Sequence, residues 1–227
     1  MSAEDLKKQA AEKAVEQVKS GMVLGLGTGS TAKYATMKIG ELWQAGALTD
    51  IVAIPTGEGT AALARQYGLP LVSLEDYPVI DVAIDGADEI GPNLDLIKGL
   101  GGALLREKMI ELATKRFIVI ADERKLVDKL GTLSPLPVEV IQFGWRYLAH
   151  RLEILGCTPA IRGGEAEPYL TDNGNYILDC HFPDGIDDPA ALAVRLREQP
   201  GVVEHGLFLG MANEAVVAMT DGIKILR

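Results

Sequence analysis

Hydrophobic and polar positions follow two alternating periods along the first 130 residues of the chain. Leu6, Ala10, Ala14 and Val18 recur at the spacing of one helix face, whereas short apolar runs bounded by glycine or polar residues are typical of buried strands. The pattern predicts helices over residues 4–19, 30–46, 58–67 and 102–115, and strands over residues 22–25, 51–54, 71–74, 79–84 and 117–121. Strands that alternate with helices predict a mostly parallel sheet with helices on both faces.

The pattern changes at Pro135 and Pro137, which mark a domain boundary or a stiff connector. Asn173 and Gly174 suit the positive φ angles of a type I′ turn and therefore predict a hairpin. Beyond the prolines we expect a helix over residues 139–155, this hairpin over 169–179, a helix over 188–199 and a strand over 202–209. An apolar stretch at 214–219 is expected to return to the first domain. We therefore expect a Rossmann-like α/β domain of residues 1–131 and 206–227, and a smaller α+β domain of residues 132–205.

Composition and charge narrow the class of protein. The chain has 227 residues, of which 48% are hydrophobic and 24% charged, so a sizeable core is expected. A net charge of −10 argues against a nucleic-acid surface and against binding to anionic lipid. The charged start of the chain does not fit a signal peptide, and no apolar run has the length of a membrane span. We expect a soluble, intracellular protein in which Cys157 and Cys180 are free thiols.

A glycine-rich segment from Gly25 to Thr31 joins a predicted strand to a predicted helix. Glycine lets the backbone approach a ligand, and the N–H groups at the start of a helix attract anions, so the segment indicates a phosphate-binding loop. A dinucleotide loop would need glycine in place of Ser30 and an acidic residue after the next strand, and both are missing. A Walker loop would need Gly-Lys-Ser/Thr, which is also missing. The alternative is a tight turn in which Ser30 caps the helix.

Two acidic residues, Asp85 and Asp88, follow the predicted strand at 79–84. Open α/β sheets bind ligands at the carboxyl ends of their strands, so both carboxylates are candidates for binding ligand hydroxyl groups. A magnesium site and a solvated acidic turn are the alternatives. Lys98 lies close in sequence, and the three histidines have no metal-ligand spacing, so we expect no metal.

A second glycine-rich segment begins at Lys98 and leads into a predicted helix that carries Glu107. The residues that share its helix face, Ala103, Ile110 and Glu111, include no cation. A carboxylate that leans toward an apolar face is a candidate general base, because burial raises its proton affinity. The alternative is an ordinary surface charge.

These segments together resemble type A ribose-5-phosphate isomerase. The resemblance extends to residues 121–125, 136–140, 171–175 and 200–208, in the family's order and spacing. It implies the reversible conversion of ribose 5-phosphate to ribulose 5-phosphate in the pentose phosphate pathway. It also implies a cytoplasmic homodimer, with a tetramer as the alternative, that uses no cofactor and no metal. A non-catalytic sugar-phosphate sensor and a related deaminase or transferase remain alternative functions.

The resemblance assigns roles to individual residues. Glu107 matches the general base that moves a proton between C2 and C1 of the sugar. Asp85 matches the acid that assists ring opening or hydroxyl proton transfer, and Lys98 matches the cation beside the enediolate. The expected substrate-binding residues are Thr28, Gly29, Ser30, Thr31, Asp85, Gly86, Ala87, Asp88, Lys98, Gly99, Leu100, Gly101, Lys125 and Lys7. Leu100 stands where the family commonly has glycine, so the resemblance does not assign the exact backbone donors at residues 99–102.

Overall fold

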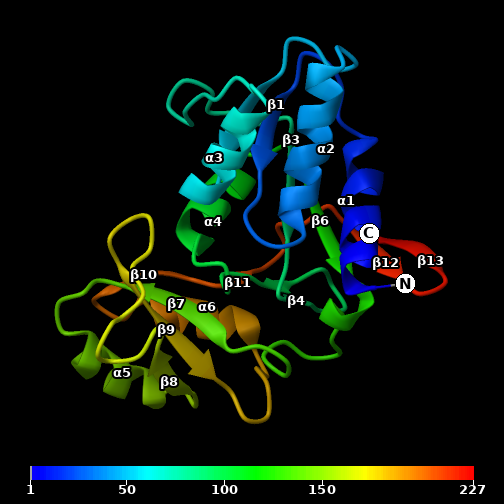
Figure 1. The fold of residues 1–227 in the computed structure, drawn as a ribbon. Helices are drawn as coiled ribbons and strands as arrows, with labels where there is room; N and C mark the ends of the chain where they lie inside the picture. The colour runs from blue at the N-terminus through cyan, green and yellow to red at the C-terminus, as the bar shows by residue number, and fades with distance from the viewer. Residues whose placement is uncertain (1) are drawn as a thin grey trace. The chain divides into compact units, whose positions relative to one another are not determined.

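The computed structural model describes residues 2–227, which divide into two compact units (Figure 1). The first unit comprises the chain up to Ala87, together with Arg106–Lys125 and Met211–Arg227, and the second comprises Asp88–Leu105 and Leu126–Gly210. The end of the chain therefore returns to the first unit, as the apolar stretch at 214–219 predicts. The domain boundaries at residues 131 and 206 stay a prediction.

The first unit is built on a six-stranded sheet in the order β13-β12-β6-β3-β1-β2. Every neighbouring pair is parallel except β12 and β13, which are antiparallel. All six residues of β6 are buried, because a central parallel strand is covered on both faces. The strands are β1 (Val23–Leu26), β2 (Val52–Pro55), β3 (Val82–Gly86), β6 (Phe117–Asp122), β12 (Glu214–Met219) and β13 (Gly222–Leu226).

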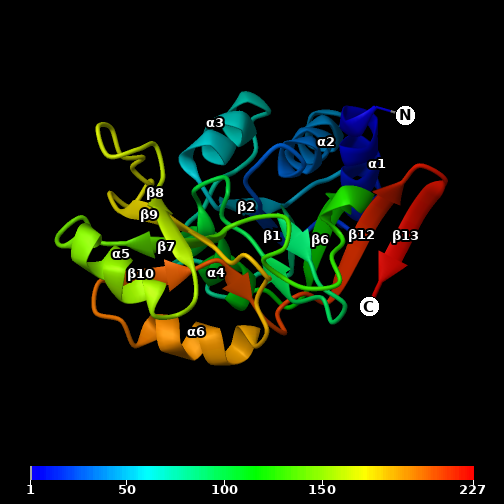
Figure 2. The same cartoon turned by 90° about the horizontal axis from the view of Figure 1, so that it is seen from below.

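Helices cover both faces of this sheet (Figure 2). Apolar residues of α1 (Ala3–Val15), α2 (Ala32–Gln44) and α3 (Glu58–Gln66) share one hydrophobic core with alternate residues of the central strands. On the other face, Ile110 of α4 (Leu104–Leu112) packs with Ile54 and Ile80 in a separate cluster. The predicted α/β class, with a mostly parallel sheet between helical layers, is confirmed.

The second unit contains a four-stranded antiparallel sheet and a small three-stranded sheet. The larger sheet has the order β10-β7-β9-β8, and the smaller has the order β11-β5-β4. Two helices, α5 and α6, share one core with apolar residues of the larger sheet, through Leu148 and Leu152 of α5 and Leu192 and Leu196 of α6. The elements are β4 (Glu89–Ile90), β5 (Leu96–Ile97), β7 (Leu136–Val140), α5 (Trp145–Glu153), β8 (Thr158–Ile161), β9 (Tyr176–His181), α6 (Pro189–Arg197), β10 (Val202–His205) and β11 (Leu207–Phe208).

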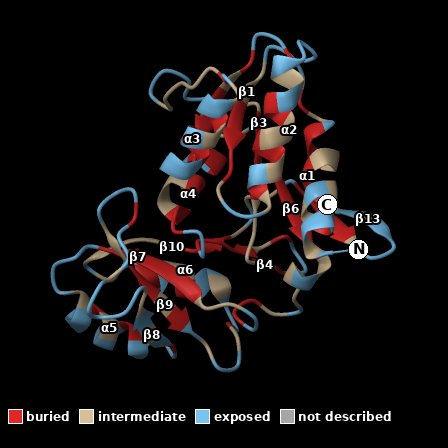
Figure 3. Cartoon of the chain, viewed as in Figure 1, coloured by how far each residue is buried: buried red, intermediate tan, exposed pale blue. Residues whose placement is uncertain are grey.

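The helix predicted over residues 139–155 is wrong in its first part. Residues up to Val140 belong to β7, and α5 begins only at Trp145. All five residues of β7 are buried (Figure 3), and the strand pairs with β10 on one side and β9 on the other. A strand buried in this way lacks the alternating pattern by which strands are recognised.

The hairpin predicted over residues 169–179 is wrong in its first strand. The strands that pair with β9 are β7 and β8, and residues 169–171 belong to no strand. Gly174 has a φ of +76°, but Asn173 has no positive φ, so the turn is not of type I′.

Two further strand predictions are wrong. In the segment 71–74, Leu71 makes one isolated bridge with Ala53 and no strand forms. The strand expected over 202–209 is divided at Gly206 into β10 and β11, which belong to different sheets. A Cβ at Gly206 would lie 2.2 Å from the carbonyl oxygen of Lys98, so the chain changes sheets at a position that only glycine fits.

Candidate active site

The first glycine-rich segment connects β1 to α2, as predicted. Gly29 has a φ of +123°, a conformation that favours glycine, and both Gly29 and Ser30 are exposed. The residue that caps α2 is Thr31, so the alternative reading of Ser30 as the helix cap is wrong. The Thr31 side chain makes no capping hydrogen bond either. The helix therefore begins with backbone N–H groups and two hydroxyl groups beside an exposed loop, which is an arrangement that suits an anion.

A group of threonine hydroxyls holds the base of this loop. Thr28 Oγ1 lies 2.7 Å from Thr56 Oγ1 and 2.8 Å from Thr60 Oγ1. Thr56 and Thr60 are buried and donate to the carbonyl oxygens of Leu26 and Gly27. The hydroxyl of Thr28 therefore fixes the conformation of the loop through its hydrogen bonds to Thr56 and Thr60. Sequence reasoning missed both partners, because they come from the next strand and helix and carry no motif of their own.

Asp85 lies at the carboxyl end of β3 and contacts the loop. Its side chain is 1% exposed, and its Oδ1 accepts a hydrogen bond of 2.6 Å from the N–H of Gly86. β1 and β3 are parallel neighbours, with Leu26 opposite Ile84, so Gly27 and Asp85, the next residue of each chain segment, lie side by side. A Cβ on Gly27 would lie 2.1 Å from Asp85 Oδ1. Gly27 thus allows the carboxylate to lie directly against the loop of residues 27–31.

Glu107 lies on α4 and is 3% exposed. Ile110, one turn later, packs so closely on β1 that a Cβ at Gly25 would lie 2.9 Å from it. Arg106 forms a 3.0 Å ion pair with Glu58 at the start of α3. The interpretation of Glu107 as an ordinary surface charge is therefore wrong. Helix α4 packs on β1, the strand that leads into the Gly27–Thr31 loop, and the Glu107 carboxylate is buried.

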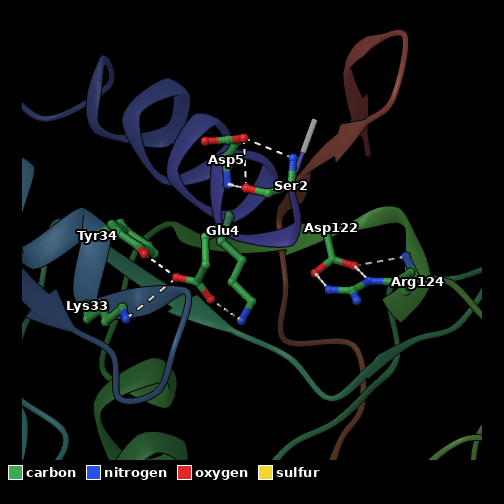
Figure 4. Close-up of polar contacts among 8 residues, drawn as sticks. Ser2, Glu4, Asp5, Lys33, Tyr34, Asp122 and Arg124 are labelled. Atoms are coloured by element: carbon green, nitrogen blue, oxygen red, sulfur yellow. Dashed lines mark hydrogen bonds and ion pairs between the residues drawn. The ribbon is translucent and has the colours of Figure 1, made fainter.

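Lys7 and Lys125 lie at two further places in the first unit. Lys7 belongs to α1, and its ammonium group lies 3.1 Å from Glu4 Oε1. Glu4 also accepts a hydrogen bond from Tyr34 and lies 3.7 Å from Lys33 (Figure 4). The hydrogen bonds from Tyr34 and Lys7 lower the pKa of Glu4. The Glu4 carboxylate therefore compensates part of the positive charge of Lys7 and Lys33.

Lys125 ends a short 3₁₀ helix, Glu123–Lys125, that directly follows β6. The helix is anchored by Asp122, whose two carboxylate oxygens lie 2.7 and 2.9 Å from the guanidinium of Arg124 (Figure 4). These hydrogen bonds lower the pKa of Asp122. The position of Lys125 is thus determined by a fixed turn at the end of a central strand.

Of the other predicted residues, Gly86 and Ala87 belong to the first unit, whereas the second unit holds Asp88 and the segment from Lys98 to Gly101. Asp88 Oδ2 accepts a hydrogen bond of 2.9 Å from the N–H of Leu100, so the acid and the segment are joined. Lys98 is 2% exposed, and its Nζ lies 5.4 Å from the centre of the Phe208 ring. The backbone N–H of Lys98 donates a hydrogen bond to the carbonyl oxygen of Gly206. Strands β5 and β11 therefore hold a buried cation at the start of the glycine-rich segment.

Leucine fits at position 100 for a simple reason. Gly99 and Gly102 have φ angles of +111° and +83°, whereas the φ of Leu100 is not positive. The Leu100 side chain is 41% exposed and so needs no space in the interior. The conformations that require glycine lie on either side, and the Leu100 N–H still serves as a donor, to Asp88.

Comparison with known proteins shows the family of the chain. A model of the family described as ribose 5-phosphate isomerase A (phosphoriboisomerase A) matches residues 52–222. The chain belongs to the ribose 5-phosphate isomerase A family.

Similarity to members of the family extends over the whole chain. A probable chloroplastic ribose-5-phosphate isomerase 3 of Arabidopsis thaliana is 53% identical and covers 100% of this chain and 84% of its own length. A ribose-5-phosphate isomerase A of Synechococcus sp. (strain JA-3-3Ab) is 52% identical over 100% of this chain and 98% of its own. A solved D-ribose-5-phosphate isomerase in complex with phospho-erythronic acid has a TM-score of 0.96 at 43% identity, covering 100% of both chains.

Residues 2–227 contain no group of three or more His, Cys, Asp or Glu side chains placed to hold a metal ion. The same part of the chain has no helix with the length and apolar character needed to cross a membrane.

Proposed function

We propose that Glu107 is the general base with which this member of the ribose 5-phosphate isomerase A family interconverts ribose 5-phosphate and ribulose 5-phosphate. The chain is an aldose–ketose isomerase of the pentose phosphate pathway, as its family is. One observation carries the assignment of the base. Glu107 is buried on a helix that packs, through Ile110, against the strand leading into the Gly27–Thr31 loop.

The reaction requires the removal of a weakly acidic proton next to a carbonyl group and its return to the neighbouring carbon. A single carboxylate above the C1–C2 bond performs both transfers, and a positioned proton transfer of this kind contributes about 10²–10⁴ in rate. We assign it to Glu107. Asp85, beside the loop, is our candidate for opening the sugar ring or moving the hydroxyl proton.

The negative charge that develops on the sugar oxygens needs a partner. We assign this role to Lys98, because a buried cation stabilises an enediolate more strongly than an exposed one does. Asp88 and the segment from Gly99 to Gly101 bind sugar hydroxyls in this proposal, as do Gly86 and Ala87. Thr28 to Thr31 bind the substrate through the loop, and Lys7 and Lys125 are candidate partners of the phosphate.

Two substitutions test these roles. Purified wild-type protein is expected to convert ribose 5-phosphate to ribulose 5-phosphate, which colorimetric or coupled ketose assays detect. Glu107→Gln keeps the size of the side chain and should lower kcat by about 10²–10⁴ without changing the melting temperature. Near wild-type kcat in this variant would disprove the assignment.

Lys98→Ala should lower kcat more than it raises KM. A change confined to KM would instead make Lys98 a residue that holds the phosphate. If the wild type bound the sugar phosphate tightly and formed no ketose, a sensor function would replace the enzymatic one.

We further propose that the chain is a cytoplasmic homodimer. Large apolar side chains in the second unit support an assembly, since Phe143, Tyr147 and Ile154 are 91%, 71% and 70% exposed. Light scattering coupled to size-exclusion chromatography is expected to give twice the chain mass of 24.3 kDa. A mass of one or four chains would contradict the dimer. Cell fractionation of the source organism tests the location.

A further inference from the structure

Arg162 contacts the backbone of the second glycine-rich segment. Its Nη1 donates to the carbonyl oxygens of Gly99 at 2.9 Å and of Leu100 at 3.1 Å. The other side of the same guanidinium binds Asp179, with Nε 3.0 Å from Oδ2 and Nη2 2.5 Å from Oδ1. Arg162 therefore joins two consecutive peptide groups of the segment to a fixed carboxylate on β9.

The anchor is more than a surface ion pair. The side chains of Arg162 and Asp179 are 15% and 18% exposed. A guanidinium that binds a carboxylate through two nitrogens has a defined plane, which a single ammonium group does not provide. Asp179 itself is fixed by pairing within the sheet, opposite Pro137 and Ala160. The direction in which Nη1 points is thus determined by the strands.

The contacts at two carbonyl oxygens also determine where the neighbouring N–H groups point. In a planar trans peptide, the C=O and the following N–H point in opposite directions. Since Arg162 binds the oxygens of Gly99 and Leu100, the N–H groups of Leu100 and Gly101 are directed away from it. The N–H of Leu100 meets Asp88 Oδ2 at 2.9 Å. The N–H of Gly101 is aimed by the same constraint.

Tyr169 gives the segment a second contact. Its N–H donates to the carbonyl oxygen of Arg162 at 2.8 Å, and its ring lies 5.8 Å from the guanidinium carbon. A Cβ at Gly102 would lie 2.2 Å from the Tyr169 hydroxyl, so this ring closes over the end of the segment. The stretch from Arg162 to Tyr169 therefore holds both ends of the turn that follows Lys98.

We propose that Arg162, anchored by Asp179, is a positioning residue of the isomerase reaction. It aims the backbone N–H of Gly101 toward the substrate, and it holds the N–H of Leu100 on Asp88. This inference rests on the proposed roles of Asp88 and of the segment from Lys98 to Gly101. A role limited to stabilising the sheet would need only the pair with Asp179, whereas the two bonds to the segment add nothing to strand pairing.

Steady-state kinetics of Arg162→Ala test the proposal. Without the Arg162 guanidinium, the carbonyl oxygens of Gly99 and Leu100 lose their hydrogen-bond donor. A displacement of about 1 Å in a positioned group lowers the rate by on the order of 10²-fold. We expect kcat/KM to fall by about 10- to 100-fold, with a decrease in kcat as well as a rise in KM. Millimolar guanidinium chloride should restore part of the activity, whereas sodium chloride at the same concentration should not.

Arg146→Ala is the matched control. Arg146 also forms an ion pair in the second unit, with Glu165, but both side chains are more than 60% exposed. We expect wild-type kinetics from this variant. Arg162→Ala that keeps kcat/KM within about twofold of wild type, or that gains nothing from guanidinium, overturns the inference. A wild-type protein without isomerase activity would instead disprove the proposed function.

Discussion

Replacing Gly27 by alanine tests whether the Gly27–Thr31 loop and Asp85 depend on direct contact. The added Cβ would lie 2.1 Å from Oδ1, 2.2 Å from Cγ and 2.5 Å from Cβ of Asp85. Carbon atoms in good contact are about 3.5–4 Å apart, so the loop or the carboxylate must move by more than about 1 Å. The N–H of Gly27 is bonded to the carbonyl oxygen of Ile84 at 3.0 Å, which prevents the loop from simply swinging away.

The expected effects follow from the size of this overlap. An extra methyl group in a tightly packed place costs about 1–3 kcal/mol of unfolding free energy. A shift of about 1 Å at a catalytic group lowers the rate by on the order of 10²-fold. We therefore expect Gly27→Ala to fold with a lower melting temperature and to lose most of its kcat.

The measurements are urea unfolding and steady-state conversion of ribose 5-phosphate. Gly59→Ala is the control, because a Cβ at this position in α3 has open space around it. Alanine is a better helix former than glycine by about 1 kcal/mol, so the control should be equally or more stable and fully active.

The same substitution in an Asp85→Gly variant shows whether contact with Asp85 causes the loss of stability. Asp85→Gly removes all three atoms that the new Cβ would meet, so adding Gly27→Ala to it should cost little further stability. An equal loss of unfolding free energy in both backgrounds would show that contact with Asp85 is not the cause. Unchanged kcat/KM and melting temperature for Gly27→Ala in the wild-type background would show that the contact matters for neither stability nor activity.

Three further predictions concern other parts of the chain. Leu100→Gly should stay within about threefold of wild-type kcat/KM and lose about 0.4–1 kcal/mol of stability through the entropy of the unfolded chain; a large loss of activity would contradict the account of this position. Burial raises the pKa of Glu214, but hydrogen bonds from a glutamine and two arginines outweigh it and lower the pKa overall. Its stabilisation is therefore present above its ordinary pKa of 4.5 and is lost as the pH falls through the lowered value. Glu214→Gln should then cost about 1–2 kcal/mol of unfolding free energy at pH 7 and less at pH 3, and an equal cost at both pH values in urea unfolding would contradict this. Cys157 and Cys180 are 6% and 0% exposed, so a thiol reagent such as DTNB should label both only after unfolding; rapid labelling of the folded protein would disprove their burial.

Local sequence was sufficient for the elements that carry the first unit. The helix before residue 20, the two glycine-rich segments and the buried strands at 22–25, 51–54 and 117–121 were all predictable, because their signals lie within a few residues. Asp85 was predicted at a strand end, and β3 ends at Gly86. The candidate chemistry could be read there because phosphate loops and paired carboxylates need particular residue types at fixed spacing.

The errors lie where long-range pairing outweighs the local pattern. Residues 136–140 form a strand because β9 and β10 pair with it from both sides. The segment 202–209 divides at Gly206 into strands of two sheets, and the carbonyl oxygen of Lys98 leaves no room for a side chain there. Neither partner is near in sequence, so no local window contains the information.

The division of information between sequence and fold is clearest at the candidate site. The kinds of residues needed to bind a phosphate and move a proton are visible in short segments of the chain, since their chemistry depends on side-chain type. The burial of Glu107, the contact of Gly27 with Asp85 and the anchoring of residues 99 and 100 by Arg162 are not visible there. They arise only when strands and helices distant in sequence pack together, because burial and the direction of a hydrogen bond are properties of neighbours in space.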